Sequence, residues 1–365
     1  MGKALRILHT ESSKGWGGQE NRTLNEMTAM RARGHELAVI GQTGARILGR
    51  AEEAGFQTFT VDMRGALDLP ALLKLRGLIR QFRADVVNTH SSRDTQLAGM
   101  AAYTLSNRPR IVRTRHLALP ITSKFTYSVL PDQVVSVSSF VGEYLVSAGV
   151  PRSQVTAIPT GIDLSRYAAD QVAGDLRREL GLPDNTVLIG TVAILRIKKG
   201  HVEVLEAAKT VLETWPNVHF VIAGDGPQQA NLIKRIEMLG LESRVHMLGL
   251  RRDVTNILKS LDLFVLPTYQ EALGTAFIEA GAMGLPVIAT AVDGVPEVVV
   301  DQETGLLVPA KDTPALAKAI LELLGNHERR QEMGIQAKKR IEERFSREAM
   351  AEGMETLYNR LLAEK

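Results

Sequence analysis

The sequence predicts an α/β protein built from two doubly wound domains. With 365 residues, of which 44% are hydrophobic, the chain exceeds the size at which a single core keeps growing. Short apolar, β-branched runs alternate with stretches of helical period, a pattern typical of parallel sheets with crossover helices. The content of 31 Gly and only 5% aromatic residues fits alternating strands, turns and helices better than an all-β sandwich.

Two sets of strands are expected along the chain. The first set comprises residues 5–9, 37–40, 58–61, 86–89, 111–114, 134–137 and 155–158. The second comprises residues 187–195, 219–223, 245–248, 263–266, 287–291 and 306–308. Each set predicts one doubly wound domain.

The boundary between the domains is expected at Ile-Pro-Thr-Gly-Ile-Asp, residues 158–163, where a Pro and a Gly end a strand run. We therefore expect a first domain over residues 1–162 and a second over 163–345. The sequence from Thr313 onward has only helical patterns. Its last part, residues 346–365, is expected to pack back toward the first domain.

Composition excludes several classes of protein. The chain has no cysteine, which rules out disulfides, Cys-ligated metals and a Cys nucleophile and fits the reducing cytosol. It has neither a signal-peptide pattern at its start nor an apolar run approaching ~20 residues. We expect a soluble, cytoplasmic protein. A diffuse basic excess without interleaved aromatic residues or a known reading motif gives no support for nucleic-acid binding.

Charge is divided unevenly along the chain. Residues 1–160 hold 20 Lys and Arg against 12 Asp and Glu, a net +8, whereas residues 161–365 carry −5. In residues 70–84, apolar side chains recur at helical spacing while Arg76, Arg80 and Arg83 line another face. This face is interpreted either as a solvated surface or as a weak contact with an anionic membrane.

The strongest local signal runs from Glu271 to Glu279 and follows the predicted strand 263–266. At the carboxyl edge of a parallel sheet, such a strand-to-helix turn borders the ligand crevice. The backbone N–H groups of Gly274, Thr275 and Ala276 would open the next helix and point at an anion such as a diphosphate. Glu271 and Glu279 would then reach sugar hydroxyls. The alternative is a capped helix with solvated acids.

A basic cluster, Arg196 to His201, follows the first strand of the second domain. Cations at a strand end can neutralise a leaving diphosphate, although basic loops are also common on surfaces. This cluster and the Glu271–Glu279 segment both follow strands of the same domain, so we expect both at one crevice.

Two features of the first domain also follow strands. Gly17 and Gly18 belong to the segment Gly-Trp-Gly-Gly-Gln-Glu, which matches neither the dinucleotide fingerprint nor a P-loop. Adjacent glycines allow the backbone to come close to a ligand, but they are equally compatible with a simple tight turn. His116 follows the strand 111–114 in Arg-Thr-Arg-His. Of the eight histidines, it is the only one whose position in a motif predicts a place beside a cleft.

Other catalytic patterns are missing from the sequence. It has no Asp-x-Asp pair, no His-Glu-x-x-His and no Gly-x-Ser-x-Gly elbow. We therefore expect neither a metal site nor a serine nucleophile, and no cofactor. Cations and helix ends would carry the electrostatic work.

With these residues in view, the chain resembles the family 4 glycosyltransferases of the GT-B fold, from Ile7 to about Phe345. The matching motifs, in order, are Gly17-Gly18-Gln-Glu20, Thr114-Arg-His116, Ile158 to Asp163, Lys199-Gly200, Ala223 to Pro227, Glu271 to Glu279, and Gly284-Leu-Pro286 through Gly294-Val-Pro-Glu297. The resemblance implies two facing Rossmann-like domains with a cleft between them, and a retaining, metal-independent transfer of a hexose-type sugar from a UDP- or GDP-sugar.

The resemblance also implies roles for individual residues. It assigns Glu271 to the transferred sugar, Glu279 to the ribose and the turn Gly274–Ala276 to the diphosphate. It assigns Lys199 and Arg196 to the leaving phosphate.

Further roles follow from the same resemblance. Leu250 and Arg251 would border the base, and His116 would reach the donor sugar. Gly17 and Gly18 would approach the diphosphate when the domains close. The acceptor is expected to be an envelope glycan or glycolipid of the lipopolysaccharide or capsule type, met at the inner face of the cell membrane.

Three positions depart from the family pattern. The family's arginine usually stands directly before a leucine, where this chain has Ile194, and Arg196 comes two residues later. Thr160 stands where the family often has an asparagine, and Asp293 stands where the family commonly has a glycine. Neither Thr160 nor Asp293 is expected to touch the chemistry directly. Two alternatives to a transferase remain, a nucleotide-sugar epimerase of the same fold and a non-catalytic sugar-nucleotide-binding subunit.

Overall fold

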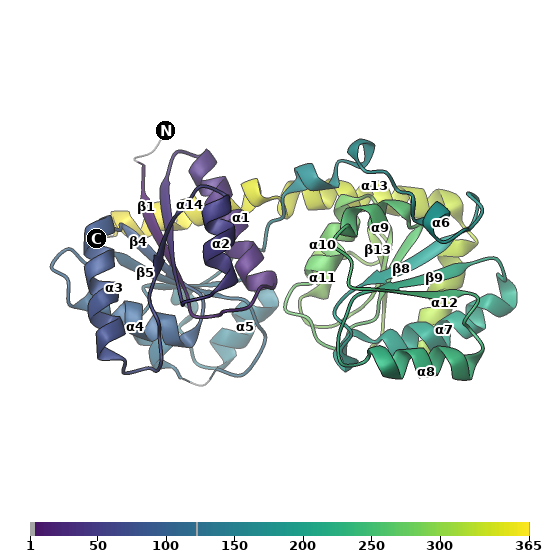
Figure 1. Ribbon diagram of the computed structural model, residues 1–365, viewed down its shortest axis with the longest axis horizontal. Coiled ribbons are helices and arrows are strands. Elements are labelled where there is room, and N and C mark those ends of the chain that lie inside the picture. Colours follow the sequence, from purple (N-terminus) through teal and green to yellow (C-terminus); the bar gives the residue numbers. More distant parts are fainter. Residues whose placement is uncertain (1–3, 122, 365) are drawn as a thin grey trace. The chain divides into compact units, whose positions relative to one another are not determined.

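A computed structural model describes residues 4–121 and 123–364; residues 1–3 and 365, at the ends of the predicted domain ranges, lie outside the described residues. The chain forms two compact units. The first consists of Met1–Ile162 with Ser346–Lys365, and the second is Asp163–Phe345. Within each unit, helices cover both faces of a sheet (Figure 1).

The first unit holds a seven-stranded sheet in which every pairing is parallel. Its strands are β1 (Arg6–Glu11), β2 (Glu36–Gly41), β3 (Gln57–Thr60), β4 (Val86–Thr89), β5 (Arg110–Arg115), β6 (Gln133–Ser136) and β7 (Val155–Ala157). Their order is β3-β2-β1-β4-β5-β6-β7. The order reverses between β1 and β4, which makes the carboxyl ends of these strands the place where ligands bind in such sheets.

Six α-helices flank this sheet in the described part of the unit. They are α1 (Gly18–Ala32), α2 (Arg46–Glu53), α3 (Leu69–Phe82), α4 (Ser92–Tyr103), α5 (Ser139–Ser147) and α14 (Arg347–Ala363). Although α14 ends the chain, it packs against α1 and adds Met350, Met354 and Tyr358 to the core beside β1. The chain end is therefore an integral part of the first unit.

The second unit has a six-stranded parallel sheet in the order β10-β9-β8-β11-β12-β13. Its strands are β8 (Leu188–Val192), β9 (His219–Ala223), β10 (Val245–Gly249), β11 (Leu263–Leu266), β12 (Val287–Thr290) and β13 (Gly305–Val308). Its helices are α6 (Leu176–Glu179), α7 (His201–Thr214), α8 (Gln229–Leu239), α9 (Val254–Ser260), α10 (Thr275–Ala282), α11 (Val295–Val298), α12 (Thr313–Leu324) and α13 (His327–Arg344). Here the order reverses between β8 and β11.

The predicted fold class, two doubly wound parallel α/β domains, is confirmed. Most predicted strands begin and end within two residues of the observed ones, because strands buried on both faces appear as apolar runs. The largest difference is at β8, which ends at Val192 although the apolar run continues to Leu195. Leu195 is a fully buried loop residue, so its hydrophobicity reflects the core and not a strand.

Helix α3 differs in detail from the amphipathic helix expected over residues 70–84. It begins after Asp68, whose side chain accepts a hydrogen bond from the Ala71 backbone N–H at 3.1 Å, and it ends at Phe82. Arg83 lies beyond the helix in a left-handed conformation (φ 52°), so it does not continue the helical arginine face.

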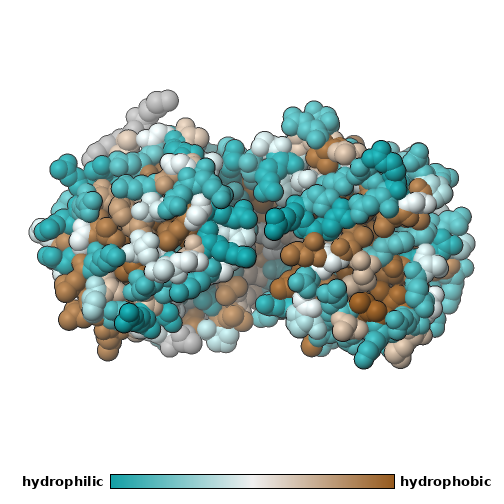
Figure 2. Space-filling view, viewed as in Figure 1, coloured by the Kyte–Doolittle hydropathy of each residue, from teal (hydrophilic) through white to brown (hydrophobic). Residues whose placement is uncertain are grey.

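The outer surface of α3 is both apolar and basic. Leu69 and Leu73 are 61% and 57% exposed, and Arg80 and Arg83 are also exposed. Figure 2 shows hydrophobic and hydrophilic residues side by side in this part of the first unit. No helix among residues 4–121 and 123–364 is long and apolar enough to span a membrane.

Candidate active site

The central strands of the second sheet bring two loops together. Because β8 and β11 are parallel neighbours, the loops that follow them leave the same edge of the sheet, at the point where the strand order reverses. The first loop contains Arg196 and Lys199, and the second contains Glu271 and Gly274. This edge is the candidate site of the second unit.

Backbone contacts fix these two loops against each other. The carbonyl oxygen of Lys198 accepts hydrogen bonds from the Tyr269 N–H at 2.7 Å and the Thr268 hydroxyl at 2.9 Å. Gly200 then starts α7 with φ 71°, and a Cβ there would collide with the carbonyl oxygen of Pro267. The close approach of the loops therefore requires glycine at position 200.

Lys199 and Glu271 form an ion pair across these loops. Their side chains are only 13% and 18% exposed, so the pair is partly withdrawn from water. Each charge compensates the other. Arg196, in contrast, is exposed at the start of the short 3-10 helix Ile197–Lys199.

Asp293 supports the Glu271 loop from the neighbouring strand end. Its carboxylate accepts a hydrogen bond from the Glu271 backbone N–H at 2.9 Å, and the Gly294 N–H donates to the Glu271 carbonyl at 3.1 Å. Asp293 adopts φ 49°, a left-handed conformation that aspartate tolerates better than most residues. Asp293 thus holds the backbone of Glu271, and the expectation that it does not touch the chemistry directly stays a prediction.

Helix α10 starts at this edge with an open N-terminus. Gly274 precedes the helix with φ 99°, and no side chain caps it. Thr275 is exposed and Ala276 partly exposed. The helix therefore begins with unpaired backbone N–H groups and the positive end of its dipole. This end lies beside the loop that carries Glu271, the partner of Lys199.

Glu279 lies one turn into α10 and is partly buried. Burial raises the pKa of its carboxyl group, and a hydrogen bond from the Tyr167 hydroxyl acts in the opposite direction. Tyr167 belongs to the short 3-10 helix Leu164–Tyr167 at the beginning of the unit. Its own pKa is raised, first by burial and then by the charge of Glu279.

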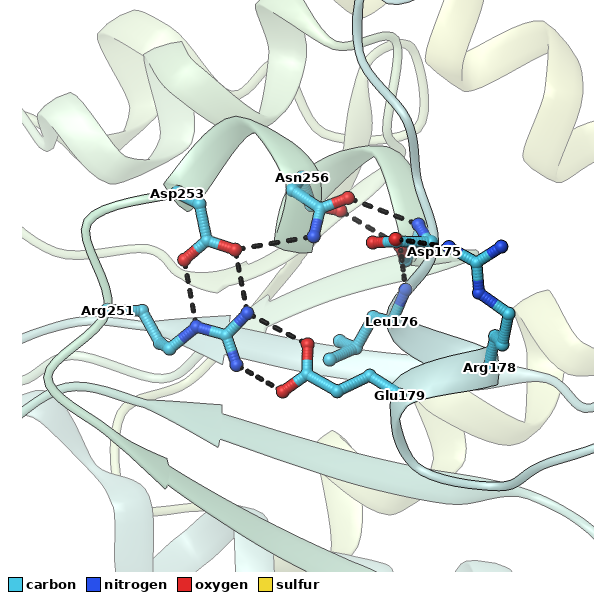
Figure 3. Close-up of polar contacts among 8 residues, drawn as sticks. Asp175, Leu176, Arg178, Glu179, Arg251, Asp253 and Asn256 are labelled. Carbon is cyan, nitrogen blue, oxygen red and sulfur yellow. Dashed lines mark hydrogen bonds and ion pairs between the residues drawn. The ribbon is translucent and has the colours of Figure 1, made fainter.

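The loop after β10 contains Leu250 and Arg251, and the two differ sharply. Leu250 is 74% exposed. The guanidinium of Arg251 is bound by two carboxylates, those of Asp253 at 2.6 to 2.8 Å and of Glu179 at 2.5 to 2.9 Å (Figure 3). These hydrogen bonds raise its pKa, so Arg251 carries a permanent charge that joins the β10 loop to α6.

In the first unit, Gly17 and Gly18 form the exposed start of α1. The Gly17 N–H donates to the Glu20 carboxylate at 2.8 Å, which fixes the loop at its junction with the helix. This loop follows β1, at the carboxyl edge of the sheet and at the reversal of strand order.

His116 directly follows β5 and is the outer member of a row of three histidines. Its Nε2 lies 3.1 Å from Nδ1 of His90, and Nε2 of His90 lies 3.1 Å from Nδ1 of His9. His9 and His90 are buried, whereas His116 is partly exposed. Burial lowers the pKa of all three, and the positive charge of Arg22 acts in the same direction. His9 and His116 further lower the pKa of His90, whereas the Glu26 carboxylate acts against burial at His9.

Both halves of the chain match known protein families. Residues 16–166 match the model "Glycosyltransferase Family 4", and residues 173–340 match "Glycosyl transferases group 1". The UDP-Gal:alpha-D-GlcNAc-diphosphoundecaprenol alpha-1,3-galactosyltransferase of Escherichia coli is 30% identical over 70% of this chain and 70% of its own length. This protein belongs to the family 4 glycosyltransferases.

Other relatives agree with this family. A capsular polysaccharide biosynthesis glycosyltransferase of Staphylococcus aureus, CapM, is 26% identical over 81% of this chain and 82% of its own length. A solved glycosyltransferase from Rickettsia africae has the same fold, with a TM-score of 0.89 at 20% identity over 99% of this chain and 100% of its own. The chain is thus a glycosyltransferase with two Rossmann-like domains of the GT-B type.

Sequence reasoning on this glycosyltransferase missed the partners of its motif residues. His90 contacts His116, Asp293 contacts Glu271 and Tyr167 contacts Glu279, while His9 contacts His90 in turn. The sequence had indicated only Asp293 among these partners, as a departure from the family pattern. Position offered a signal for two of them, because His90 follows β4, the strand next to β5, and His9 lies in β1, on the other side of β4.

Proposed function

We propose that this glycosyltransferase moves a hexose-type sugar from a nucleotide diphosphate donor, a UDP- or GDP-sugar, to a hydroxyl group of an envelope glycan or glycolipid. The transfer retains the anomeric configuration and needs no metal ion. The observation that carries the proposal is the meeting of Lys199, Glu271 and the open end of α10 at one sheet edge.

These groups match the charges of such a donor. The diphosphate would bind to the N–H groups of Gly274, Thr275 and Ala276 and to the cations Lys199 and Arg196. Because the diphosphate is an anion, it competes with Glu271 for the Lys199 ammonium. Donor binding would thereby release the Glu271 carboxylate to contact the sugar.

The remaining contacts follow the order of groups along the donor. Glu279 would bind the ribose hydroxyls. Leu250 would cover one face of the base, while Arg251, whose side chain is already bound to two carboxylates, would border it mainly through its backbone. In the first unit, His116 is assigned to the transferred sugar.

Gly17 and Gly18 are assigned to the diphosphate. Their exposed backbone at the start of α1 offers N–H groups without side chains that would block an anion.

Charge stabilisation explains the proposed chemistry. As the bond between sugar and phosphate breaks, negative charge grows on the leaving diphosphate, where Lys199, Arg196 and the dipole of α10 stabilise it. The acceptor hydroxyl would attack the face from which the diphosphate departs and give its proton to the leaving phosphate. The protein supplies position and charge in this mechanism.

The proposed acceptor class rests on the relatives. The Escherichia coli relative is named for a diphosphoundecaprenol-linked acceptor and the Staphylococcus aureus one for capsular polysaccharide. A lipid-linked acceptor would be met at the inner face of the cell membrane. The exposed Leu69, Leu73 and Arg80 of α3, together with Arg83 just after the helix, would support weak contact with that surface.

One experiment separates this function from its alternatives. Purified protein is screened against a panel of nucleotide sugars by thermal shift, and nucleotide release is then measured with and without candidate acceptors. A transferase releases nucleoside diphosphate faster when acceptor is added. A new sugar formed without acceptor would instead identify an epimerase, and binding without any turnover would identify a non-catalytic subunit.

A further inference from the structure

The row of histidines in the first unit has a direction that its surroundings impose. Neutral imidazole carries one hydrogen on either Nδ1 or Nε2, and the other nitrogen accepts. In a row of neutral rings joined by two hydrogen bonds, all hydrogens must point the same way. Either each ring donates through Nε2 toward His9, or each donates through Nδ1 toward His116.

Thr23 favours donation toward His9. Its hydroxyl donates to the carbonyl of Gln19 at 3.1 Å, so its single hydrogen is already used. The same oxygen lies 3.4 Å from Nε2 of His90 and turns only lone pairs toward it. A hydrogen on Nε2 of His90 is attracted by these lone pairs, whereas a lone pair there would be repelled.

Glu26 favours the same direction from the inner end of the row. Its Oε1 lies 3.8 Å from Nε2 of His9 and accepts hydrogen bonds from the Tyr358 hydroxyl at 2.8 Å and from the Asn88 amide at 3.2 Å. An oxygen that accepts from these donors presents negative charge to His9. A hydrogen on Nε2 of His9 is therefore stabilised and a lone pair is not.

The groups that set this direction are shielded from water, so no water molecule can satisfy the opposite arrangement of hydrogens. Glu26, His9 and Thr23 are all fully buried, and in such surroundings electrostatic interactions are strong. Burial lowers the pKa of His9 and outweighs the opposing charge of Glu26, and Arg22, buried one turn before Glu26 on α1, lowers it further. The three rings stay neutral and their hydrogens remain coupled.

We infer that Glu26, Thr23, His9 and His90 act as positioning residues that fix His116 as its Nε2–H tautomer, so that its Nδ1 is a hydrogen-bond acceptor for a sugar hydroxyl. Donation from Nε2 of His116 to His90 leaves a lone pair on Nδ1. Such a nitrogen accepts from a hydroxyl and repels a phosphate oxygen. The inference rests on the proposed function for the identity of the ligand, but the tautomer is a property of the free protein.

The test is nitrogen NMR of the full chain labelled with 15N-histidine, since long-range proton–nitrogen spectra distinguish the two tautomers and the charged ring. His35 provides an internal reference. Its Nδ1 accepts from the Leu5 N–H at 3.1 Å and its Nε2 lies 3.1 Å from the Glu355 carboxylate, so it must carry Nε2–H. His116 is assigned by the signal lost in His116→Asn.

We expect the pattern of Nε2–H for His116 in the wild-type protein at neutral pH. If the wild-type spectrum showed His116 as the Nδ1–H tautomer or as a charged ring, the inference would be overturned. This outcome does not depend on the folding of any variant. In Glu26→Gln, which keeps an oxygen for Tyr358 and Asn88, we expect a measurable population of the Nδ1–H form of His116. The matched control Glu355→Gln removes a carboxylate beside another histidine and should alter His35 alone.

Turnover separates the positioning role from the proposed function. Glu26→Gln should lower kcat by roughly three- to tenfold, the equivalent of one misdirected hydrogen bond, with little change in donor KM. An unchanged His116 tautomer in Glu26→Gln would overturn the role of Glu26. A changed tautomer with unchanged kcat would leave that role standing and overturn the assignment of His116 to the sugar.

Discussion

The Lys199 ammonium and the Glu271 carboxylate form an ion pair although 72 residues separate them in the chain. The two residues lie in the loops that follow β8 and β11, so the pairing depends on the adjacency of these strands. When a donor binds, the Lys199 ammonium would contact the leaving diphosphate and the Glu271 carboxylate would contact the sugar. Loss of either residue should therefore affect transfer in a distinct way.

The first prediction concerns the cation. Lys199→Ala should lower turnover by roughly two to three orders of magnitude, the range for loss of one preorganised electrostatic donor. Lys198→Ala is the matched control, because Lys198 contacts the second loop through its backbone carbonyl, which the substitution keeps. Turnover is measured as nucleoside diphosphate release with acceptor present. Near-normal turnover of Lys199→Ala would contradict the assignment.

Metal dependence is tested with the same assay. Since Lys199, Arg196 and the end of α10 are expected to neutralise the diphosphate, EDTA should leave wild-type turnover unchanged. Strict dependence on added Mg²⁺ or Mn²⁺ would refute the metal-free mechanism.

The second prediction separates the two glutamates. Glu271 would contact the sugar as its ring gains positive character, so Glu271→Gln should depress kcat far more than it raises donor KM. Glu279 would bind ribose equally in ground and transition states, so Glu279→Gln should mainly raise donor KM. Matching kinetic defects in both variants would end this division of roles. Proton NMR of an early product must also show the donor's anomeric configuration.

The third prediction uses the pKa of Glu279, which burial raises and the Tyr167 hydroxyl partly restores. A carboxyl group with a raised pKa takes up its proton at a higher pH than usual, and the protonated form binds ribose hydroxyls less well. Donor KM should therefore rise as pH falls. Tyr167→Phe removes the opposing hydrogen bond, so the rise should begin at a higher pH. Identical pH profiles of KM for the two proteins would contradict this role.

The fourth prediction concerns the basic surface formed by Arg80 of α3 and by Arg83 just after the helix. Arg80→Glu with Arg83→Glu should weaken binding to anionic vesicles roughly 30-fold or more, since each basic residue near such a surface contributes ~1 kcal/mol. The control pair Arg46→Glu with Arg152→Glu makes the same charge change on other exposed residues. Binding should be weak and salt-sensitive, and neutral vesicles should not bind. Equal vesicle binding by both double variants would favour a merely solvated helix face.

The fold was predictable because its information is local. Buried parallel strands are apolar along their whole length, and three of them, 86–89, 219–223 and 263–266, coincide with the predicted ranges. Leu195 shows the limit of this signal, since a buried loop residue is as apolar as a strand residue. Local pattern gives the elements more reliably than their ends.

The contacts of the site were less predictable because they join distant parts of the chain. His9 and His90 are 81 residues apart and meet only through the order β1-β4-β5. Asp293 reaches Glu271 through a left-handed backbone that no motif indicates. Arg251 has a recognisable position, but its two carboxylate partners come from folding. Sequence indicated which residues matter, and the fold determines how they are paired.

The last prediction concerns Glu11, a fully buried carboxyl group at the end of β1. Burial, reinforced by the nearby Asp94, raises its pKa from 4.5 to about 8, although Gln19 and the Ser13 N–H donate hydrogen bonds to it. The folded protein thus binds more protons than the unfolded chain between these pH values. Glu11 therefore contributes a fall in stability as pH rises through this window, of up to about 1.4 kcal/mol per pH unit. Glu11→Gln should remove that slope, measured by urea unfolding from pH 5 to pH 8, whereas the exposed control Glu53→Gln should retain it. A Glu11→Gln protein with the same pH slope as the wild type would show that Glu11 is ionised in the folded state.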